Sequence, residues 1–454
     1  MDRGQVGILV LLALCGCAPT EVPVGDRLVL QHATVIDGTG AGPRDDVTIV
    51  IQGGRIESIE SGNGGQSLVA DRVIDLRGRW VVPGFIDTHA HVSNEFRFEI
   101  LRTLLAFGIT TIRNPAAPSE TGVRTREQVA SGEIVGPRIF TAGPYITVNP
   151  LDRRIRSGVA VHVDTDADVR EEVKRQAASG VDYIKVYRSL PSELVTAAIE
   201  EAHTHGIKVI GHLGRTSWIE AARAGIDGFV HSFPGMLPLR GEDLANLSRA
   251  EYERRWRPTL ALRRREMDTL VATLLDGRLE VNPTLVMTET LRFSDDPGVL
   301  ERLEPSFAPK EMAAAWRAES HPYTREQTAE DFKEMQAGFP TILEVVRLFH
   351  QRGVLLTAGT DVGNPWITPG VSFHRELELL VRAGIDPLDV LSIATRNGAE
   401  VLGVLDEVGT IEPGKIADLV VLLADPLARI SDTRRIDLVI QRGEVLQPDT
   451  LIGN

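Results

Sequence analysis

Residues 81–92, VVPGFIDTHAHV, decide the fold. This stretch combines a short apolar strand and a Pro-Gly turn with two histidines, His89 and His91, at its end. Residues two apart in an extended chain point to the same side, so both imidazoles can reach one metal ion. The stretch therefore predicts a strand that delivers two metal ligands.

Four more side chains that can bind a metal or a proton lie near the ends of short apolar or β-branched runs. They are Lys185 in DYIKVY, His212 in KVIGH, His231 in GFVHS and Asp361 in VLLTAGTD. In a barrel whose strands alternate with helices, every strand delivers its last residues to one common mouth. Residues far apart in the sequence can then surround a single point. With the two histidines of the first strand, these side chains predict a metal centre.

Eight strand candidates alternate with amphipathic helical segments, several of which end in Gly as a C-cap. The strand candidates are residues 81–87, 109–114, 138–143, 182–187, 208–212, 228–232, 281–287 and 354–361. Repeated units in this number favour an α/β fold with a (β/α)8 TIM barrel over a doubly wound sheet. Two long charged stretches, 249–278 and 293–335, are predicted to be helical insertions over the mouth of the barrel.

Both ends of the chain are rich in short Val/Ile strands with Gly and Pro turns. Residues 27–82 and residues 408–450 each hold too few strands for a sandwich of their own. We therefore expect the two segments to pair into one small β-sandwich domain. Residues 83–407 would then be inserted between them as the barrel.

The composition argues against a disordered chain and against a polytopic membrane protein. The chain has 454 residues, 43% hydrophobic and 25% charged, which is typical of a globular protein. The net charge of −14 argues against a nucleic-acid partner, because such binding needs clustered Lys and Arg. The sequence leaves homo-oligomerisation open.

The N-terminus resembles a bacterial lipoprotein signal over residues 1–17. Arg3 precedes an apolar stretch that is too short to span a bilayer and ends in Leu-Cys-Gly-Cys. Cys17 would be lipidated and would anchor an exported protein to the membrane of the cell envelope, on the periplasmic or outer face. The alternatives are a plain secretory peptide and an uncleaved apolar N-terminus. Both cysteines lie in this segment, so a metal must rely on N and O donors.

Spacing alone does not identify the site, because the chain has a second HxH pair, His203-Thr204-His205. This pair ends a helical segment before the KVIGH strand, so we expect a surface helix end at the opposite face of the barrel. A lone His212 or His231 would also be typical of a structural residue. Two such histidines on consecutive strands, beside an HxH pair, favour metal ligation.

Lys185 is unusual because burying a charged Lys inside an apolar strand costs folding free energy unless the amine is paired, neutralised or modified. Reaction with CO2 would convert its amine into a carbamate with two oxygens, one for each of two metals. The alternative is a salt bridge to a neighbouring strand.

The ordered set of His89, His91, Lys185, His212, His231 and Asp361 resembles the amidohydrolase superfamily in its two-metal, carbamylated-lysine form. VVPGFIDTHAHV, GITTIRN at 108–114 and the tail at 396–422 extend the resemblance to nearly all of the chain after residue 27. It is closest to the prolidase- and imidazolonepropionase-like branch. Asn114 stands where the branch often has Asp, and Gly214 and Arg215 stand where some members have Tyr.

The resemblance implies a metal-dependent hydrolase that cleaves C–N amide bonds of dipeptides, N-acyl amino acids or cyclic amides with a hydroxide that bridges two divalent ions. His89, His91 and Asp361 would hold one ion, and His212 and His231 the other, with carbamylated Lys185 (N6-carboxylysine) between them. Zinc is the expected ion. Asp361 would also be the catalytic residue that moves the proton to the leaving nitrogen.

Tyr187 follows Lys185 on the same strand face and is a candidate for a hydrogen bond to the substrate. Arg188, Arg215 and His374 are candidates for contact with a substrate carboxylate or for support of the site from behind. The alternative for each is a structural or surface role. Two other functions stay open at this point. The same site could hydrolyse a lactone or a phosphotriester. The chain could also be a non-catalytic, membrane-tethered lipoprotein that binds metal or solute.

Overall fold

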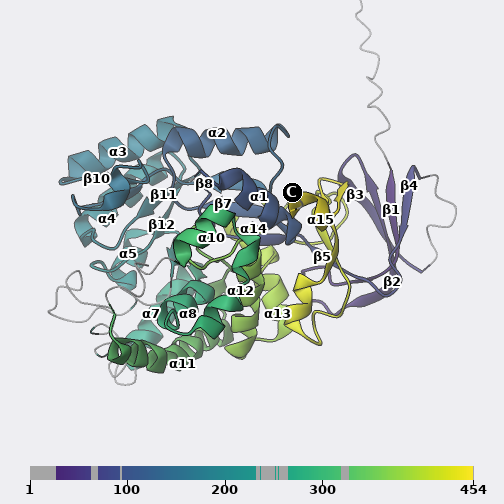
Figure 1. Cartoon of the computed structure of the whole chain (residues 1–454). Coiled ribbons are helices and arrows are strands. Elements are labelled where there is room, and N and C mark those ends of the chain that lie inside the picture. Colours follow the sequence, from purple (N-terminus) through teal and green to yellow (C-terminus); the bar gives the residue numbers. More distant parts are fainter. Residues whose placement is uncertain are drawn as a thin grey trace, which may run out of the picture.

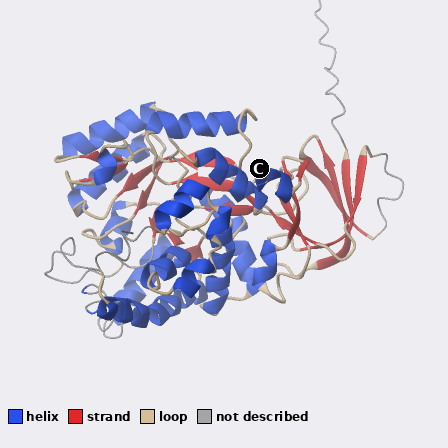
Figure 2. Ribbon diagram, in the orientation of Figure 1, coloured by secondary structure: helices blue, strands red, loops and turns tan. Residues whose placement is uncertain are grey.

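The computed structural model describes residues 27–62, 70–92, 95–231, 264–317 and 327–452, together with residues 236, 251 and 254. Helices surround a group of parallel strands, and a separate sheet stands to one side (Figures 1 and 2). The predicted signal segment, with Cys17, lies outside the described residues. Within the described part of the chain, no helix has the length and apolar composition that a membrane span requires.

Strands from both ends of the chain form one mixed sheet. It runs in the order β18-β17-β16-β5-β1-β2-β3, and β4 also pairs with β1. Its strands are β1 (Leu28–Val35), β2 (Arg44–Gln52), β3 (Arg55–Ser61), β4 (Arg72–Asp75), β5 (Trp80–Pro83), β16 (Leu419–Leu422), β17 (Ile436–Gln441) and β18 (Glu444–Leu446). β5 pairs antiparallel with β16, and Val81 lies opposite Val421. The two ends of the chain therefore pair as expected, whereas the two-sheet sandwich stays a prediction.

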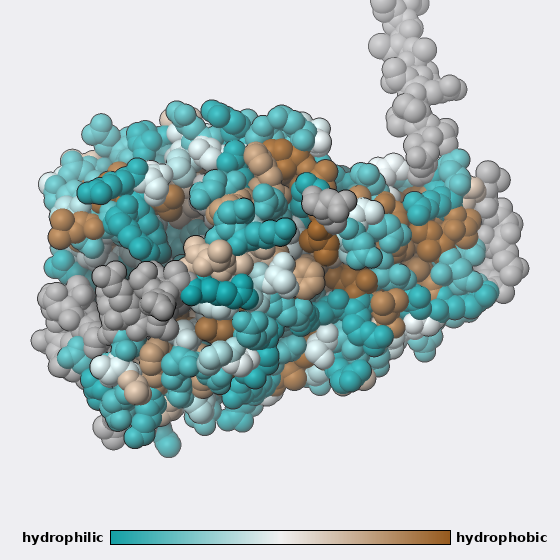
Figure 3. Space-filling model, viewed as in Figure 1, coloured by the Kyte–Doolittle hydropathy of each residue, from teal (hydrophilic) through white to brown (hydrophobic). Residues whose placement is uncertain are grey.

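Alternation of side chains gives this sheet a core of its own. Leu28 and Leu30 of β1 and Ile49 and Ile51 of β2 are buried in one cluster with Val421. Residues two apart share a face of a strand, so the alternating pattern in the sequence places these side chains together. Hydrophilic side chains cover most of the face seen in Figure 3, and hydrophobic ones gather over the region of this sheet.

The middle of the chain supplies parallel strands in two sheets, β6-β7-β8 and β10-β9-β11-β12-β13-β14-β15. Their bounds are β6 (Phe85–Asp87), β7 (Ile109–Asn114), β8 (Arg138–Thr141), β9 (Tyr145–Thr147), β10 (Ala160–His162), β11 (Tyr183–Val186), β12 (Lys208–Gly211), β13 (Gly228–Val230), β14 (Glu280–Asn282) and β15 (Leu355–Leu356). Every residue of β7 and of β11 is buried. Burial on both faces is typical of parallel strands that helices cover.

Two isolated bridges connect the two parallel sheets. Ala142, directly after β8, forms a parallel bridge with Tyr183 of β11. Ala90, after β6, forms another with Val362, after β15. Strands from the two halves of the middle segment therefore lie next to one another at two places.

Helices connect most of the parallel strands and pack on their outer faces (Figure 1). The helices of this region are α1 (Arg97–Ala106), α2 (Ser119–Ala130), α3 (Asp166–Ala178), α4 (Ser192–Thr204), α5 (Trp218–Ala224), α7 (Arg264–Asp276), α8 (Leu285–Arg292), α9 (Pro297–Glu301), α10 (Lys310–Trp316), α11 (Ala329–Gln351), α12 (Val371–Arg382), α13 (Pro387–Ile393) and α14 (Arg396–Leu402). Short 3-10 turns are η1 (Arg153–Ile155), η3 (Pro305–Phe307) and η4 (Ile430–Arg434), and α15 (Pro448–Ile452) ends the described chain. Thr165 begins α3 with a capping box, as does Ser217 for α5, which satisfies free backbone N–H groups.

Two expectations about this region need correction. α7, in the stretch predicted to cover the mouth, packs against α5 and leads directly into β14. It is therefore the helix that connects β13 to β14, and not a lid. The strand expected at residues 281–287 ends at Asn282, because Thr284 has a φ of 43° and α8 begins at Leu285. A β-branched residue in the left-handed region cannot continue a strand.

Candidate functional site

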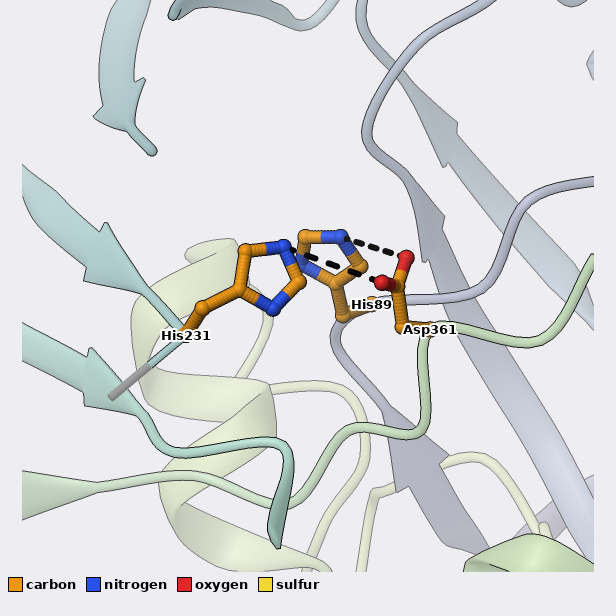
Figure 4. Close-up of side chains that lie close together, drawn as sticks. All are labelled: His89, His231 and Asp361. Atoms are coloured by element: carbon orange, nitrogen blue, oxygen red, sulfur yellow. Dashed lines mark ion pairs between the residues drawn. The ribbon is translucent and has the colours of Figure 1, made fainter. Parts of the chain in front are cut away.

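The acidic residue of the predicted set lies at the centre of three histidines. Oδ1 of Asp361 is 3.3 Å from Nε2 of His89 and 3.1 Å from Nε2 of His91. Oδ2 of Asp361 is 3.8 Å from Nε2 of His231. Figure 4 shows the rings of His89 and His231 turned toward this carboxylate. Segments after β6, β13 and β15 thus meet at one point.

The other two predicted residues join the same cluster. Nζ of Lys185, in β11, is 3.5 Å from Nε2 of His89. The ring of His212, after β12, has its centroid 4.5 Å from that of His231, which in turn is 4.6 Å from that of His89. All six side chains singled out in the sequence therefore lie together.

Backbone hydrogen bonds between neighbouring strands place these side chains. Asp361 N donates to His89 O at 2.7 Å, and His231 N donates to Asn282 O at 2.9 Å. Asp361 and His231 both have a φ of 65°, in the left-handed region that non-glycine residues seldom occupy. Such conformations persist only where the surrounding structure holds them, and they concentrate at functional sites.

Asp87 and Thr284 support the cluster from behind, and neither was predicted from the sequence. The Asp87 carboxylate accepts hydrogen bonds from His89 N at 2.9 Å and from Thr360 Oγ1 at 2.7 Å. It thereby ties the HxH segment to the segment that carries Asp361. Oγ1 of Thr284 lies 2.8 Å from Nδ1 of His231, which leaves Nε2 of that ring facing the carboxylate. An acid two residues before an HxH pair was the available signal for Asp87.

Burial favours the neutral forms of the bases of the cluster. It lowers the pKa of His231 to about 4 and the pKa of His89 well below its usual value. It also lowers the pKa of Lys185 to about 7, although Asp361 opposes that shift. Neutral nitrogens have free lone pairs, which both metal binding and reaction with CO2 require.

Asp361, unlike the bases, is held in its charged form. Burial by itself raises the pKa of a carboxyl, but contacts with His231 and His89 hold the pKa of Asp361 well below its usual value. The group is therefore a carboxylate near neutral pH, although its side chain is only 8% exposed.

The donor set fits a divalent metal ion. Ligand atoms of His89, His231 and Asp361 all lie within 4.8 Å of one another. Oδ1 of Asp361 is buried close to two imidazoles, yet it accepts a hydrogen bond with correct geometry from none of the described groups. Converging nitrogen and carboxylate donors without mutual hydrogen bonds are typical of a site for zinc or a similar ion.

The residues predicted to contact the substrate lie at different distances from the cluster. The ring of Tyr187 packs 4.8 Å from that of His212, at the edge of the cluster. Arg215 and Arg188 have exposed side chains and are linked by a backbone hydrogen bond, and their contact with a substrate stays a prediction.

The predicted substrate contact of His374 needs correction. It is fully buried on α12, with Nδ1 2.9 Å from Thr433 Oγ1 and Nε2 3.1 Å from Phe107 O. Both ring nitrogens are occupied by protein partners, so we assign His374 a structural role in place of the predicted substrate contact.

The second HxH pair lies where the sequence placed it. α4 ends at Thr204, and both histidines are exposed. His203 bonds Asp227 at 3.0 Å and His205 lies 3.3 Å from Glu201. The prediction of a surface helix end is confirmed.

The chain is similar to known enzymes over most of its length. Imidazolonepropionase from Pseudomonas putida is 25% identical over 426 residues, which cover 87% of this chain and 92% of that enzyme. Enamidase from Eubacterium barkeri is 26% identical over 202 residues, which cover 42% of this chain and 50% of that enzyme.

Solved structures share the fold. A Xaa-Pro dipeptidase with bound methionine has a TM-score of 0.70 at 21% identity, with 93% of this chain and 100% of that chain covered. The bottromycin amidohydrolase has a TM-score of 0.70 at 23% identity, with 93% and 87% covered. The model of the amidohydrolase family matches residues 80–234 and 339–446, more than half of the chain. The protein therefore belongs to the amidohydrolase family, in its prolidase- and imidazolonepropionase-like branch.

Proposed function

We propose that this protein is a metal-dependent hydrolase of C–N amide bonds. The observation that carries the proposal is the convergence of all six predicted side chains in one cluster that is largely withdrawn from solvent, with Asp361 within 4 Å of three imidazoles. These side chains come from segments far apart in the sequence, so a structural role for each separately does not account for their meeting. The substrates we propose are dipeptides, N-acyl amino acids or cyclic amides.

The proposal includes a closed (β/α)8 barrel as the scaffold. The parallel strands β6, β7, β8, β11, β12, β13, β14 and β15 pair in this order within the two sheets. The Ala142–Tyr183 and Ala90–Val362 bridges supply the two missing contacts of a ring. Active sites of such barrels lie at the carboxyl ends of the strands, where this cluster lies.

We propose that His89, His91 and Asp361 hold one divalent ion and that His212 and His231 hold the other. When bound, such ions lower the pKa of water and polarise a carbonyl group. Asp361 accepts the proton of the attacking water and delivers it to the leaving nitrogen.

Lys185 is proposed to bridge the two ions as a carbamate. Its buried amine is neutral over part of the accessible pH range, because burial lowers its pKa to about 7. The nitrogen lone pair forms a bond to the carbon of CO2 while one C=O π bond breaks and its electrons move to oxygen. The nitrogen then loses a proton to solvent water, which leaves an anion with two oxygens. That anion removes the conflict between an ammonium group and cations in the same site.

Thr284→Val is expected to weaken metal binding about 10- to 100-fold, because it removes the group that orients the His231 ring. The measurement is a zinc titration of the metal-free protein. Thr290→Val is the matched control, because Thr290 lies in α8, which begins directly after Thr284, and its hydroxyl donates to the Val286 carbonyl and not to a cluster residue among those described. Equal affinities in the two variants would contradict the role given to Thr284.

An activity screen tests the proposed reaction. Metal-reconstituted protein is offered N-acyl amino acids, dipeptides, lactones and phosphotriesters, before and after treatment with a chelator. We expect amide turnover that chelation abolishes and added metal restores. Efficient cleavage of lactones or phosphotriesters without amide turnover would replace the proposed reaction, and bound metal with no turnover would point to a binding protein.

A further inference from the structure

An arginine that the metal cluster does not use lies beside it. Arg154 belongs to the short turn η1 between β9 and β10. Its Nη1 donates a hydrogen bond to Tyr187 Oη at 3.3 Å, and the Tyr187 ring packs 4.8 Å from that of His212. One tyrosine therefore separates the guanidinium group from a proposed metal ligand.

The position of Arg154 is fixed by its neighbours. Asp152 accepts hydrogen bonds from Arg154 N at 3.0 Å and from Tyr145 Oη at 2.6 Å. The Tyr145 ring stacks on that of Tyr187 with centroids 4.2 Å apart, and the guanidinium carbon lies 6.0 Å from the Tyr145 centroid. Aromatic faces and a hydroxyl thus hold the cation in place. Tyr145 begins β9 and Tyr187 directly follows β11, and these two strands pair at Ile146 and Val186.

The charge of Arg154 has no acidic partner in the part of the chain that the structure describes. Arg113 and Arg375, which are also withdrawn from solvent, each form an ion pair with a glutamate at 2.8 Å or less. Asp152 is near Arg154 in the chain, but its contacts are with Tyr145 and a backbone N–H. A half-buried cation without a carboxylate costs free energy that a bound anion would recover.

The field of this cation reaches the cluster. Burial is the largest cause that lowers the pKa of Lys185 and of His231. The positive charge of Arg154 lowers both pKa values further. Because Arg154 contacts Tyr187 and the Tyr187 ring packs on His212, an anion bound at Arg154 would lie one side chain away from the cluster.

We propose that Arg154 binds a carboxylate of the substrate and so selects amides that carry one, such as N-acyl amino acids and dipeptides. This rests on the proposed amide hydrolysis. The planar guanidinium group can donate two parallel hydrogen bonds to a carboxylate, which gives both affinity and orientation. Such a contact would place the substrate on the side of the cluster where Tyr187 and His212 lie.

The test compares Arg154→Met with the wild type on N-acetyl-L-amino acids and on the corresponding N-acetyl-L-amino acid amides, with acetate release as the readout. On the carboxylate substrates we expect kcat/KM to fall about 10- to 100-fold, mainly through KM. On the neutral amides the change should stay within about 3-fold. Equal losses on both series, or unchanged selectivity, would overturn the inference.

Arg156→Met is the matched control, because Arg156 is exposed on the same loop and the variant removes the same charge. It should leave both series unchanged. Arg154→Lys keeps the charge but loses the planar fork, so we expect it to recover part of the selectivity. A loss in Arg156→Met as large as that in Arg154→Met would assign the effect to net charge and overturn the inference.

A binding experiment separates this inference from the proposed reaction. In the Asp361→Asn background, calorimetry measures the affinity for an N-acetyl-L-amino acid and for its amide, with and without Arg154→Met. We expect the carboxylate ligand to bind about 10- to 100-fold more tightly than the amide, and the second substitution to remove that difference. Carboxylate binding that depends on Arg154 without amide turnover in the wild type would refute only the reaction. Amide turnover without that dependence would refute only the inference.

Discussion

Asp361→Asn should abolish turnover while much of the bound metal stays in place. Asn keeps a side-chain oxygen where Oδ1 of Asp361 meets His89 and His91, but it cannot accept the proton of the attacking water. Loss of a positioned general base typically costs about 10²- to 10⁴-fold in rate. The measurement is kcat on the best amide substrate, beside metal content by elemental analysis.

Asp389→Asn is the control for the chemical change itself, because Asp389 is exposed and its ion pair among the described residues is with His350, which is not part of the cluster. It should match the wild type in rate and metal content. If Asp361→Asn retained activity near that of the control, another group would have to move the proton. If it lost the metal entirely, its rate would report on ligation and not on proton transfer.

Arg113→Met should strongly destabilise the folded protein. Arg113 of β7 is fully buried and forms two hydrogen bonds to Glu280 of β14, at 2.7 and 2.8 Å. Its Nε also donates to Thr88 O, one residue before His89. Removing one partner of a buried ion pair leaves an uncompensated charge and costs about 3–5 kcal/mol. The measurement is the free energy of unfolding from urea titrations.

Two further variants show whether the buried pair is the cause. Arg126 forms an ion pair with Asp182 at 2.8 Å, and the two side chains are 25% and 27% exposed, so water screens the pair and Arg126→Met should cost only about 1 kcal/mol. The double variant Arg113→Met, Glu280→Gln should recover part of the lost stability, because no unpaired charge remains. A cost for Arg113→Met as small as that for Arg126→Met would show that water or rearrangement satisfies Glu280.

The sequence predicted that the six residues meet in one cluster because each lies in or just after a short apolar strand. Strand periodicity and burial are local properties, and parallel strands bring their carboxyl ends to one side. The same logic separated His203 and His205, at the end of a helix, from the pair at His89 and His91. The pairing of the chain ends was also predictable, since neither end had enough strands to bury its own apolar face.

Local patterns failed where the path of the chain between strands decides the outcome. The apolar residues after Asn282 suit a strand or a helix equally, and the left-handed conformation of Thr284 starts α8 there. The charged composition of α7 gave no sign that the helix connects β13 to β14. His374 has the residue type of a ligand, but its helix faces Phe107 and Thr433.

By itself, then, the sequence determined the family, the six residues of the cluster and the alternation of strands and helices, because these depend on residue type and on spacing within single elements. Only the tertiary structure decided which groups support and flank the cluster. Asp87 and Thr284 act through contacts across strands, and Arg154 reaches the site through Tyr187, 33 residues away in the chain. Such contacts depend on the course of loops, which neither hydrophobic period nor motif spacing encodes.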